Sequence, residues 1–105
     1  METSQRVAIV NKKGLHARAS AAFARLAGAY SADISVRHNG EKANGEHIMD
    51  LLMLAAHKGT EIEIHAKGAD AEAALSALIE LVTNGFGELL QDQGGSAETG
   101  KDAGA

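Results

Sequence analysis

The chain contains no cysteine, and that absence removes two kinds of structure at once. Neither a disulfide framework nor a thiolate metal site can form, which is typical of proteins that work in a reducing compartment. No apolar run approaches the length that crosses a bilayer, and Met1 does not open a basic and then apolar signal segment. We therefore expect a cytoplasmic protein that has no membrane partner.

Aromatic residues and proline are also scarce. Only 3% of the 105 residues are aromatic and none is proline, although 45% are hydrophobic. This composition predicts one small domain with an aliphatic, alanine-rich core, which we expect to be a monomer. The formal net charge of −4 argues against a nucleic-acid partner, because proteins that bind polyanions usually carry an excess of cations.

One short segment, GLHARAS at residues 14–20, places a histidine where a strand-like pattern gives way to a helical one. Apolar residues alternate over residues 6–10, whereas from Ala17 they recur at three- and four-residue spacing. We therefore expect His16 at the N-cap of a helix, where the first backbone N–H groups, near Ala17 and Arg18, and the helix dipole favour an anion.

The residue types at this position allow phosphoryl chemistry. A neutral imidazole is a nucleophile toward phosphorus, and the Arg18 guanidinium can make charge-assisted hydrogen bonds to a phosphoryl group. His16 and Arg18 are the candidate catalytic residues, and Ala17 and Arg18 the candidate phosphate-binding residues. Spacing alone leaves a second interpretation open, in which His16 is a polar cap residue and Arg18 a solvated side chain.

The rest of the chain alternates between strand and helix patterns. Asn39-Gly40 is typical of a type I′ hairpin turn. The predicted strands are residues 6–10, 32–38, 41–44 and 61–67. The predicted helices are residues 17–30, 48–56 and 71–84, the last with Asp70 as its N-cap and Gly85 just beyond its end. This βαββαβα order predicts an α+β open-faced sandwich, with three helices on one face of a four-stranded antiparallel sheet. We expect residues 1–90 to form this domain and residues 91–105, rich in Gly, Ser, Gln and Asp, to be a disordered tail.

Several segments together resemble a known family. GLHARAS, the Asn39-Gly40 turn, IMDLLML at 48–54 and ALIELVTNGFGE at 77–88 are similar to parts of the HPr family of phosphocarrier proteins, most of all its nitrogen-related branch, NPr. The resemblance covers residues 5 to about 88. It implies a histidine phosphocarrier of the bacterial phosphoenolpyruvate-dependent phosphotransferase system, without a cofactor, that is a carrier with a phosphohistidine intermediate rather than a stand-alone enzyme. Nδ1 of His16 would accept phosphate from enzyme I and donate it to an enzyme IIA, and Arg18 would support this transfer.

Two positions depart from the pattern of that family. Ala19 stands where most relatives have proline, which is favoured in the first helical turn, so the helix loses some pre-organisation. His47 stands where relatives regulated by a serine kinase have serine. Because an imidazole offers no hydroxyl, we do not carry regulation by serine phosphorylation over to this chain.

Candidate partner contacts lie around the same region: Leu15, Ala19, His47, Ile48, Leu51 and Leu52. Helical spacing separates Leu51 and Leu54 from the Ile48–Leu52 stripe, and we expect this pair to be partly exposed for docking. The alternative function is a non-catalytic regulatory module of the same fold that binds kinases or transporter components. Such a module would not need both His16 and Arg18.

The remaining histidines do not predict a metal site. No two of them have the i, i+4 spacing of a helical zinc motif. We expect His38 and His65 to be solvated on the polar faces or at the ends of strands, and His57 to lie in a loop.

Overall fold

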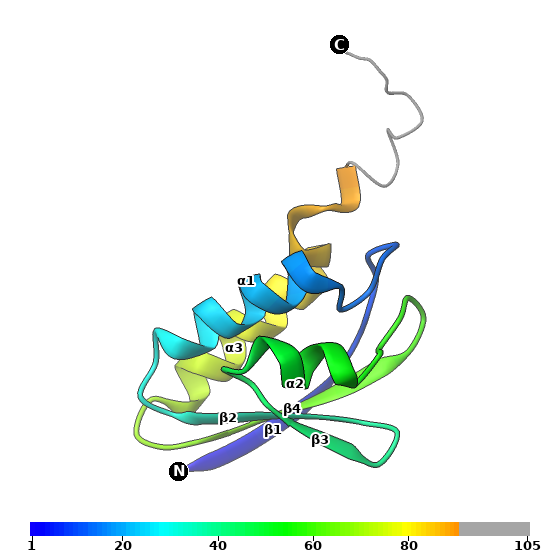
Figure 1. Cartoon of the computed structure of the whole chain (residues 1–105). Helices are drawn as coiled ribbons and strands as arrows, with labels where there is room; N and C mark the ends of the chain where they lie inside the picture. Colours follow the sequence, from blue (N-terminus) through cyan, green and yellow to red (C-terminus); the bar gives the residue numbers. More distant parts are fainter. Residues whose placement is uncertain (91–105) are drawn as a thin grey trace.

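Four strands form one antiparallel sheet in the order β1-β4-β2-β3, so the first strand pairs with the last (Figure 1). The computed structural model describes residues 1–90, and the predicted tail at 91–105 lies outside the described residues. The strands are β1 (Glu2–Ala8), β2 (Asp33–His38), β3 (Glu41–Asn44) and β4 (Glu61–Lys67). The helices are α1 (Ala17–Gly28), α2 (Ile48–Met53) and α3 (Ala71–Thr83), followed by the short 3₁₀ turn η1 (Gly85–Gly87).

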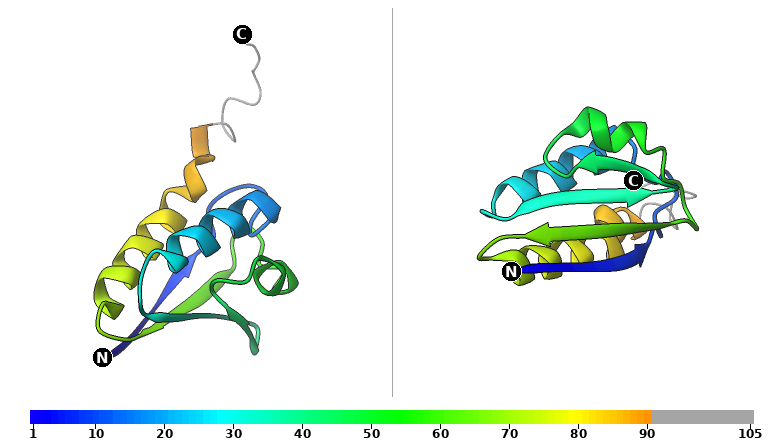
Figure 2. Two further views of the ribbon diagram at one scale, coloured as in Figure 1. Left: turned by 60° about the vertical axis from the view of Figure 1, so that its left-hand side comes forward. Right: turned by 90° about the horizontal axis from the view of Figure 1, so that it is seen from below.

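All three helices cover the same face of the sheet, as Figures 1 and 2 show. Alternation along the strands turns Val36, Ile62 and Ile64 toward the helices, where each is at most 1% exposed. Phe23 of α1 and Leu78 of α3 complete this layer and are fully buried. The predicted α+β open-faced sandwich is therefore confirmed. Within the described part of the chain, no helix has the length and apolar character needed to cross a bilayer.

The Asn39-Gly40 turn has the predicted geometry, with φ values of +51° and +81°. The first strand, by contrast, begins at Glu2 rather than at residue 6, since its polar residues pair by backbone register with β4 as far as Lys67. The first residues of this strand are polar, so they lack the alternation of apolar and polar residues by which a sequence predicts a strand.

The second helix is shorter than predicted and ends at Met53 rather than at Ala56. Ala55 takes the left-handed conformation, with φ of +54°, and this conformation stops the helix. The third helix has Asp70 as N-cap and Gly85 just beyond its end, as expected. The Asp70 carboxylate, however, accepts hydrogen bonds of 2.8 Å from the backbone N–H groups of Ser31 and Ala32 instead of capping its own helix.

The expectation that His38 is solvated was wrong. The side chain follows Ile34 and Val36 on the inward face of β2, and His38 is only 7% exposed. Its Nδ1 lies 3.1 Å from the carbonyl oxygen of Glu61. Strand periodicity, rather than side-chain polarity, decides the placement of this residue.

Gly14 fixes the loop that leads into α1. Its φ is +65°, and a Cβ there would lie 2.8 Å from the Cα of His57 and closer still to the Ala56 carbonyl oxygen. That oxygen accepts a hydrogen bond of 2.9 Å from the Leu15 N–H. The loop before α1 is thus pressed against the segment that follows α2.

We predict that Gly14→Ala destabilises the fold more than Gly40→Ala. Both glycines have positive φ, which costs alanine about 1 to 2 kcal/mol. Only Gly14 meets backbone atoms, whereas nothing lies within 4 Å of a Cβ at Gly40, so overpacking should add about 1 to 3 kcal/mol at Gly14 alone. Urea unfolding of both variants measures the difference, and equal losses of unfolding free energy would contradict the close approach.

Candidate functional site

His16 is the N-cap residue of α1, as the sequence predicted. Its backbone is extended, with φ of −73° and ψ of −178°, and its carbonyl oxygen accepts the first helical hydrogen bond, 2.8 Å from the Ser20 N–H. The Ser20 hydroxyl donates to the Leu15 carbonyl oxygen at 3.1 Å, which ties the segment before the cap to the helix. The His16 side chain is 25% exposed. One edge of the ring is thus open to a reacting group.

The Nδ1 atom of His16 accepts a hydrogen bond of 3.3 Å from the backbone N–H of Arg18. A backbone N–H can only donate, so Nδ1 carries a lone pair rather than a proton. This lone pair lies at the first turn of α1, where the backbone N–H groups have no partners within the helix. A nucleophilic nitrogen and an anion site therefore occupy the same end of α1.

The Nε2 atom of the same ring lies 2.6 Å from Oε2 of Glu88, whose side chain is only 9% exposed. The other carboxylate oxygen of Glu88 accepts a hydrogen bond of 3.0 Å from Nδ2 of Asn11. Asn11 is fully buried and also donates to the Gly14 carbonyl oxygen at 2.9 Å. Two segments far apart in the sequence, the loop of residues 11–16 and the chain at Glu88, thus meet at the His16 ring.

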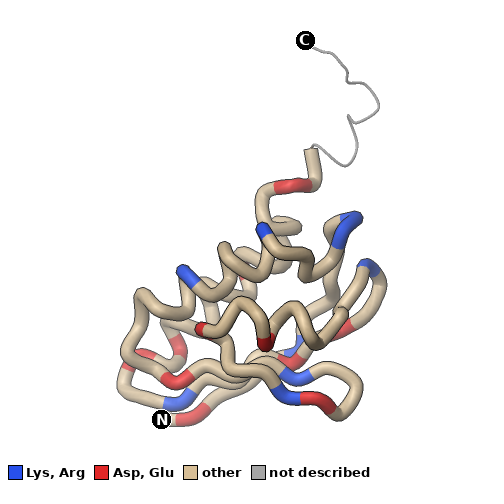
Figure 3. The backbone as a smooth tube through the Cα atoms, in the orientation of Figure 1, with Lys and Arg blue, Asp and Glu red and all other residues tan. Residues whose placement is uncertain are grey.

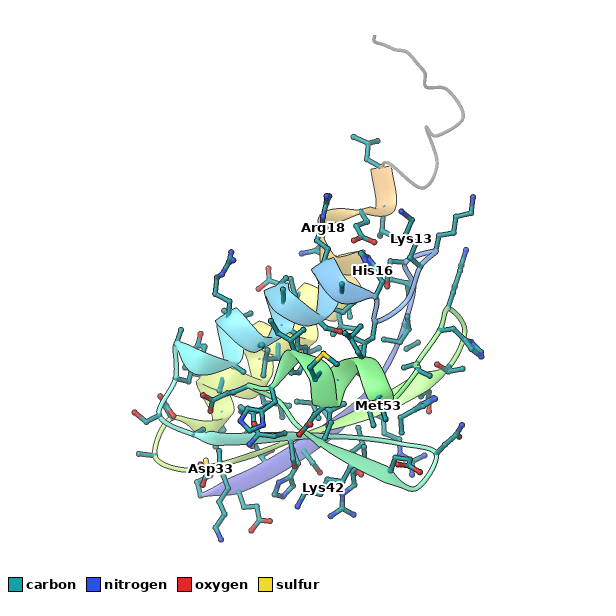
Figure 4. The ribbon with its side chains drawn as sticks, viewed as in Figure 1. Lys13, His16, Arg18, Asp33, Lys42 and Met53 are labelled. Atoms are coloured by element: carbon teal, nitrogen blue, oxygen red, sulfur yellow. The ribbon has the colours of Figure 1, made fainter. Side chains whose placement is uncertain are left out.

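Basic residues surround the open side of the site. The exposed basic residues are Arg18 in the first turn of α1 and Lys12 and Lys13 in the preceding loop. Ala17, beside Arg18, is also exposed. Figure 3 shows basic positions on this loop and on α1, and Figure 4 shows the side chains of Lys13, His16 and Arg18 at the same end of the helix. The arrangement suits a dianionic group such as a phosphoryl, because backbone N–H donors and exposed cationic side chains can share its charge.

Residues 3–84 match the family model described as "PTS HPr component phosphorylation site". The chain belongs to the HPr family of phosphocarrier proteins. It is 46% identical over 84 residues to phosphocarrier protein HPr of Neisseria meningitidis, which covers 80% of this chain and 94% of the relative. It is 38% identical over 89 residues to phosphocarrier protein NPr of Escherichia coli, covering 84% and 99%.

Solved structures of the family share the fold. An HPr from Thermoanaerobacter tengcongensis superimposes with a TM-score of 0.79 at 36% identity, over 82% of this chain and 97% of that one. An HPr from Bacillus anthracis gives a TM-score of 0.74 at 38% identity, over 77% and 96%. Since relatives named HPr and relatives named NPr both match, membership of the HPr family does not by itself select the nitrogen-related branch.

Three of the six candidate partner contacts are buried. Leu15 is 4% exposed, and Ala19 and Leu51 are fully buried, so their side chains are not available to a partner. Leu15 precedes α1, Ala19 lies on the buried face of α1, and Leu51 faces the core from α2. Leu54, expected to be exposed together with Leu51, is also buried.

The second helix instead exposes the apolar side chains of Ile48, Met49 and Met53, which we call the α2 patch. Figure 4 labels Met53 on this helix. Met53 is 78% exposed and Ile48 is 42% exposed. Of the two other candidates here, His47 is exposed and Leu52 is half-buried. Five of the six residues of α2 are apolar, so spacing could not decide which of them face the core.

The other histidines are not part of the site. His47 begins α2 without a capping hydrogen bond and lies 3.5 Å from an Asp50 carboxylate oxygen. His65 pairs with Glu2 at 2.6 Å on the open face of the sheet. Residues 1–90 hold no group of three or more His, Asp or Glu side chains placed to bind a metal ion.

Asn11 and Glu88 are the site residues that the sequence did not reveal. Seventy-seven positions separate them, and each lies in a stretch with no catalytic motif. Only the fold, which brings the end of α3 back to the start of α1, shows that they belong to the His16 site.

We predict that Asn11→Ala lowers the free energy of unfolding by about 1 to 3 kcal/mol, because it strips a donor from the buried Gly14 carbonyl and from Glu88. Asn84→Ala is the matched control, since Asn84 is exposed and its side chain caps nothing. That control should change stability by less than about 0.5 kcal/mol. Chemical unfolding compares the two variants, and an Asn11→Ala protein as stable as the control would show that the buried amide holds nothing.

Proposed function

We propose that the chain carries a phosphoryl group on Nδ1 of His16, which it receives from enzyme I and passes to an enzyme IIA of the phosphotransferase system. The observation that supports this most directly is the hydrogen bond from the Arg18 N–H to Nδ1, because it places an unprotonated ring nitrogen at the positive end of a helix. Family membership supplies the class of reaction.

The transfer needs little movement within the site. The Nδ1 lone pair attacks phosphorus, a nitrogen–phosphorus bond forms, and the bond between phosphorus and the donor breaks. The Arg18 N–H, released from Nδ1, then donates to a phosphoryl oxygen, together with the N–H of Ala17. The exposed Arg18 guanidinium adds a charge-assisted contact. The protein is thus a carrier that is modified and restored in each cycle.

Partner proteins dock over α1 and the α2 patch. Ile48, Met49 and Met53 give an apolar surface of the kind that monomeric proteins rarely expose without use. Lys12, Lys13 and Arg18 beside it favour an acidic partner. We propose that the chain acts in the cytoplasm as a monomer, although one relative from Thermoanaerobacter tengcongensis is named as an HPr dimer.

We predict that His16→Ala abolishes phosphorylation and that His47→Ala does not. The two histidines each begin a helix, yet only His16 accepts a hydrogen bond from the first turn of its helix. The measurement is acid-labile phosphate, located by mass spectrometry, after incubation with phosphoenolpyruvate and enzyme I of the same organism. Full labelling of the His16→Ala chain would overturn the proposal, and an unlabelled wild type would favour a docking module instead.

We predict that Arg18→Ala slows phosphorylation roughly ten- to a hundredfold, the effect of losing one charge-assisted hydrogen bond. Arg25→Ala is the matched control, because it removes an exposed arginine from the last turn of the same helix. Initial rates at subsaturating enzyme I measure both. Equal rates for Arg18→Ala and the wild type would mean that the backbone N–H groups suffice.

A further inference from the structure

We infer that Glu88 is a positioning residue for phosphoryl transfer: it holds the Nε2 proton of His16 and balances the positive charge that the ring gains when Nδ1 is phosphorylated. This inference rests on the proposed function of His16. If His16 were only an N-cap residue, it would not need a buried carboxylate at Nε2, and the inference gives that carboxylate a role.

The two ring nitrogens of His16 have partners of opposite kind. Glu88 offers an ionised carboxylate, which only accepts, so the Nε2 atom at 2.6 Å carries the proton. The Arg18 N–H only donates, so Nδ1 carries the lone pair. One neutral form of the ring satisfies both contacts, namely the form with its proton on Nε2. Glu88 therefore leaves the lone pair on Nδ1, the nitrogen that faces the first turn of α1.

The carboxylate also matches the charge changes of the reaction. When the neutral ring attacks, Nδ1 bonds to phosphorus while the donor's bond to that phosphorus breaks, and Nε2 keeps its proton. The ring becomes a phosphoimidazolium with one positive charge, directly beside Glu88. In the reverse step the ring leaves as a neutral imidazole that still holds the Nε2 proton. A carboxylate that stabilises an imidazolium without taking its proton has the same role in the Ser-His-Asp triad.

The surroundings of Glu88 show that the fold maintains this contact at a cost. A carboxylate as buried as this one needs donors, and Asn11 and His16 supply them. Asn11 does so although its own Oδ1 is buried without a partner among the described residues. Leaving a buried oxygen without a hydrogen-bond donor is unfavourable. The amide nevertheless directs its Nδ2 toward Glu88.

The backbone just before Glu88 also adopts an unfavourable conformation. Gly85, Phe86 and Gly87 have φ values of +63°, +57° and +79°, three left-handed residues in succession. Phe86 is the unfavourable member, because a bulky side chain rarely adopts this conformation. The Glu88 N–H closes the turn by donating to the Gly85 carbonyl oxygen at 2.9 Å. This turn directs the chain from the end of α3 to the position where the Glu88 side chain contacts His16.

The first test reads the ring directly. The full-length chain, labelled with ¹⁵N, is phosphorylated with phosphoramidate, and long-range ¹H–¹⁵N spectra at neutral pH report the protonation of Nε2; His16→Ala identifies the signal. We expect Nε2 to remain protonated in the wild type and in Glu80→Gln, an exposed glutamate that loses the same charge. We expect Nε2 to lose its proton in Glu88→Gln. Identical spectra for Glu88→Gln and the wild type would overturn the inference.

The second test measures transfer in both directions. Forward rates use phosphoenolpyruvate and enzyme I, and reverse rates use the phosphorylated chain with enzyme I and pyruvate. Glu88→Gln should slow both roughly ten- to a hundredfold, Glu88→Asp should recover part of the loss because it keeps the charge, and Glu80→Gln should match the wild type. Should Glu88→Gln fail to fold, as judged by its amide spectrum, Glu88→Asp carries the test with an intermediate loss.

The outcomes for the two proposals are separable. Unchanged rates in Glu88→Gln, with a normally phosphorylated wild type, would overturn the role of Glu88 alone. A wild type that phosphoramidate phosphorylates on His16 but enzyme I does not would overturn the proposed function, while the ¹⁵N spectra would still decide whether Glu88 holds the Nε2 proton.

Discussion

The site depends on one constraint: the imidazole of His16 is held at both nitrogens. The Arg18 N–H contacts Nδ1 from the first turn of α1, and the Glu88 carboxylate contacts Nε2 from the segment after α3. The first contact is local, between residues two positions apart, whereas the second joins residues 72 positions apart and depends on how α3 packs in the fold. The segment after α3 completes the site, because it carries Glu88.

The one-sided sheet places the His16 site and the α2 patch in the same layer of the molecule. The helices shield the apolar face, so the loops at the start of α1 and the short α2 form the edge of that layer (Figure 1). A short helix can bury only part of its apolar surface, and the α2 patch is the remainder. The cations of the α1 loop stand beside it, although the chain as a whole carries a formal net charge of −4.

Most of the fold could be predicted because its elements follow strong local patterns. The Asn39-Gly40 turn, the alternation of β4 and the cap at His16 each depend on a few adjacent residues. The face that α2 presents could not be predicted, since apolar residues occur all around it, and neither could the burial of His38. Glu88 and Asn11 were beyond reach for a different reason: their contact joins residues 77 positions apart, and no local pattern encodes it.

The central claim is that His16 presents its Nδ1 lone pair to the start of α1 while its proton remains on Nε2. The most direct measurement is the long-range ¹H–¹⁵N spectrum of the unphosphorylated chain at mildly alkaline pH, read together with the hydrogen exchange of the Arg18 amide. The account predicts a neutral ring with its proton on Nε2 and an Arg18 amide that exchanges slowly for its position in the first turn. A ring with its proton on Nδ1, together with an Arg18 amide that exchanges freely, would contradict it.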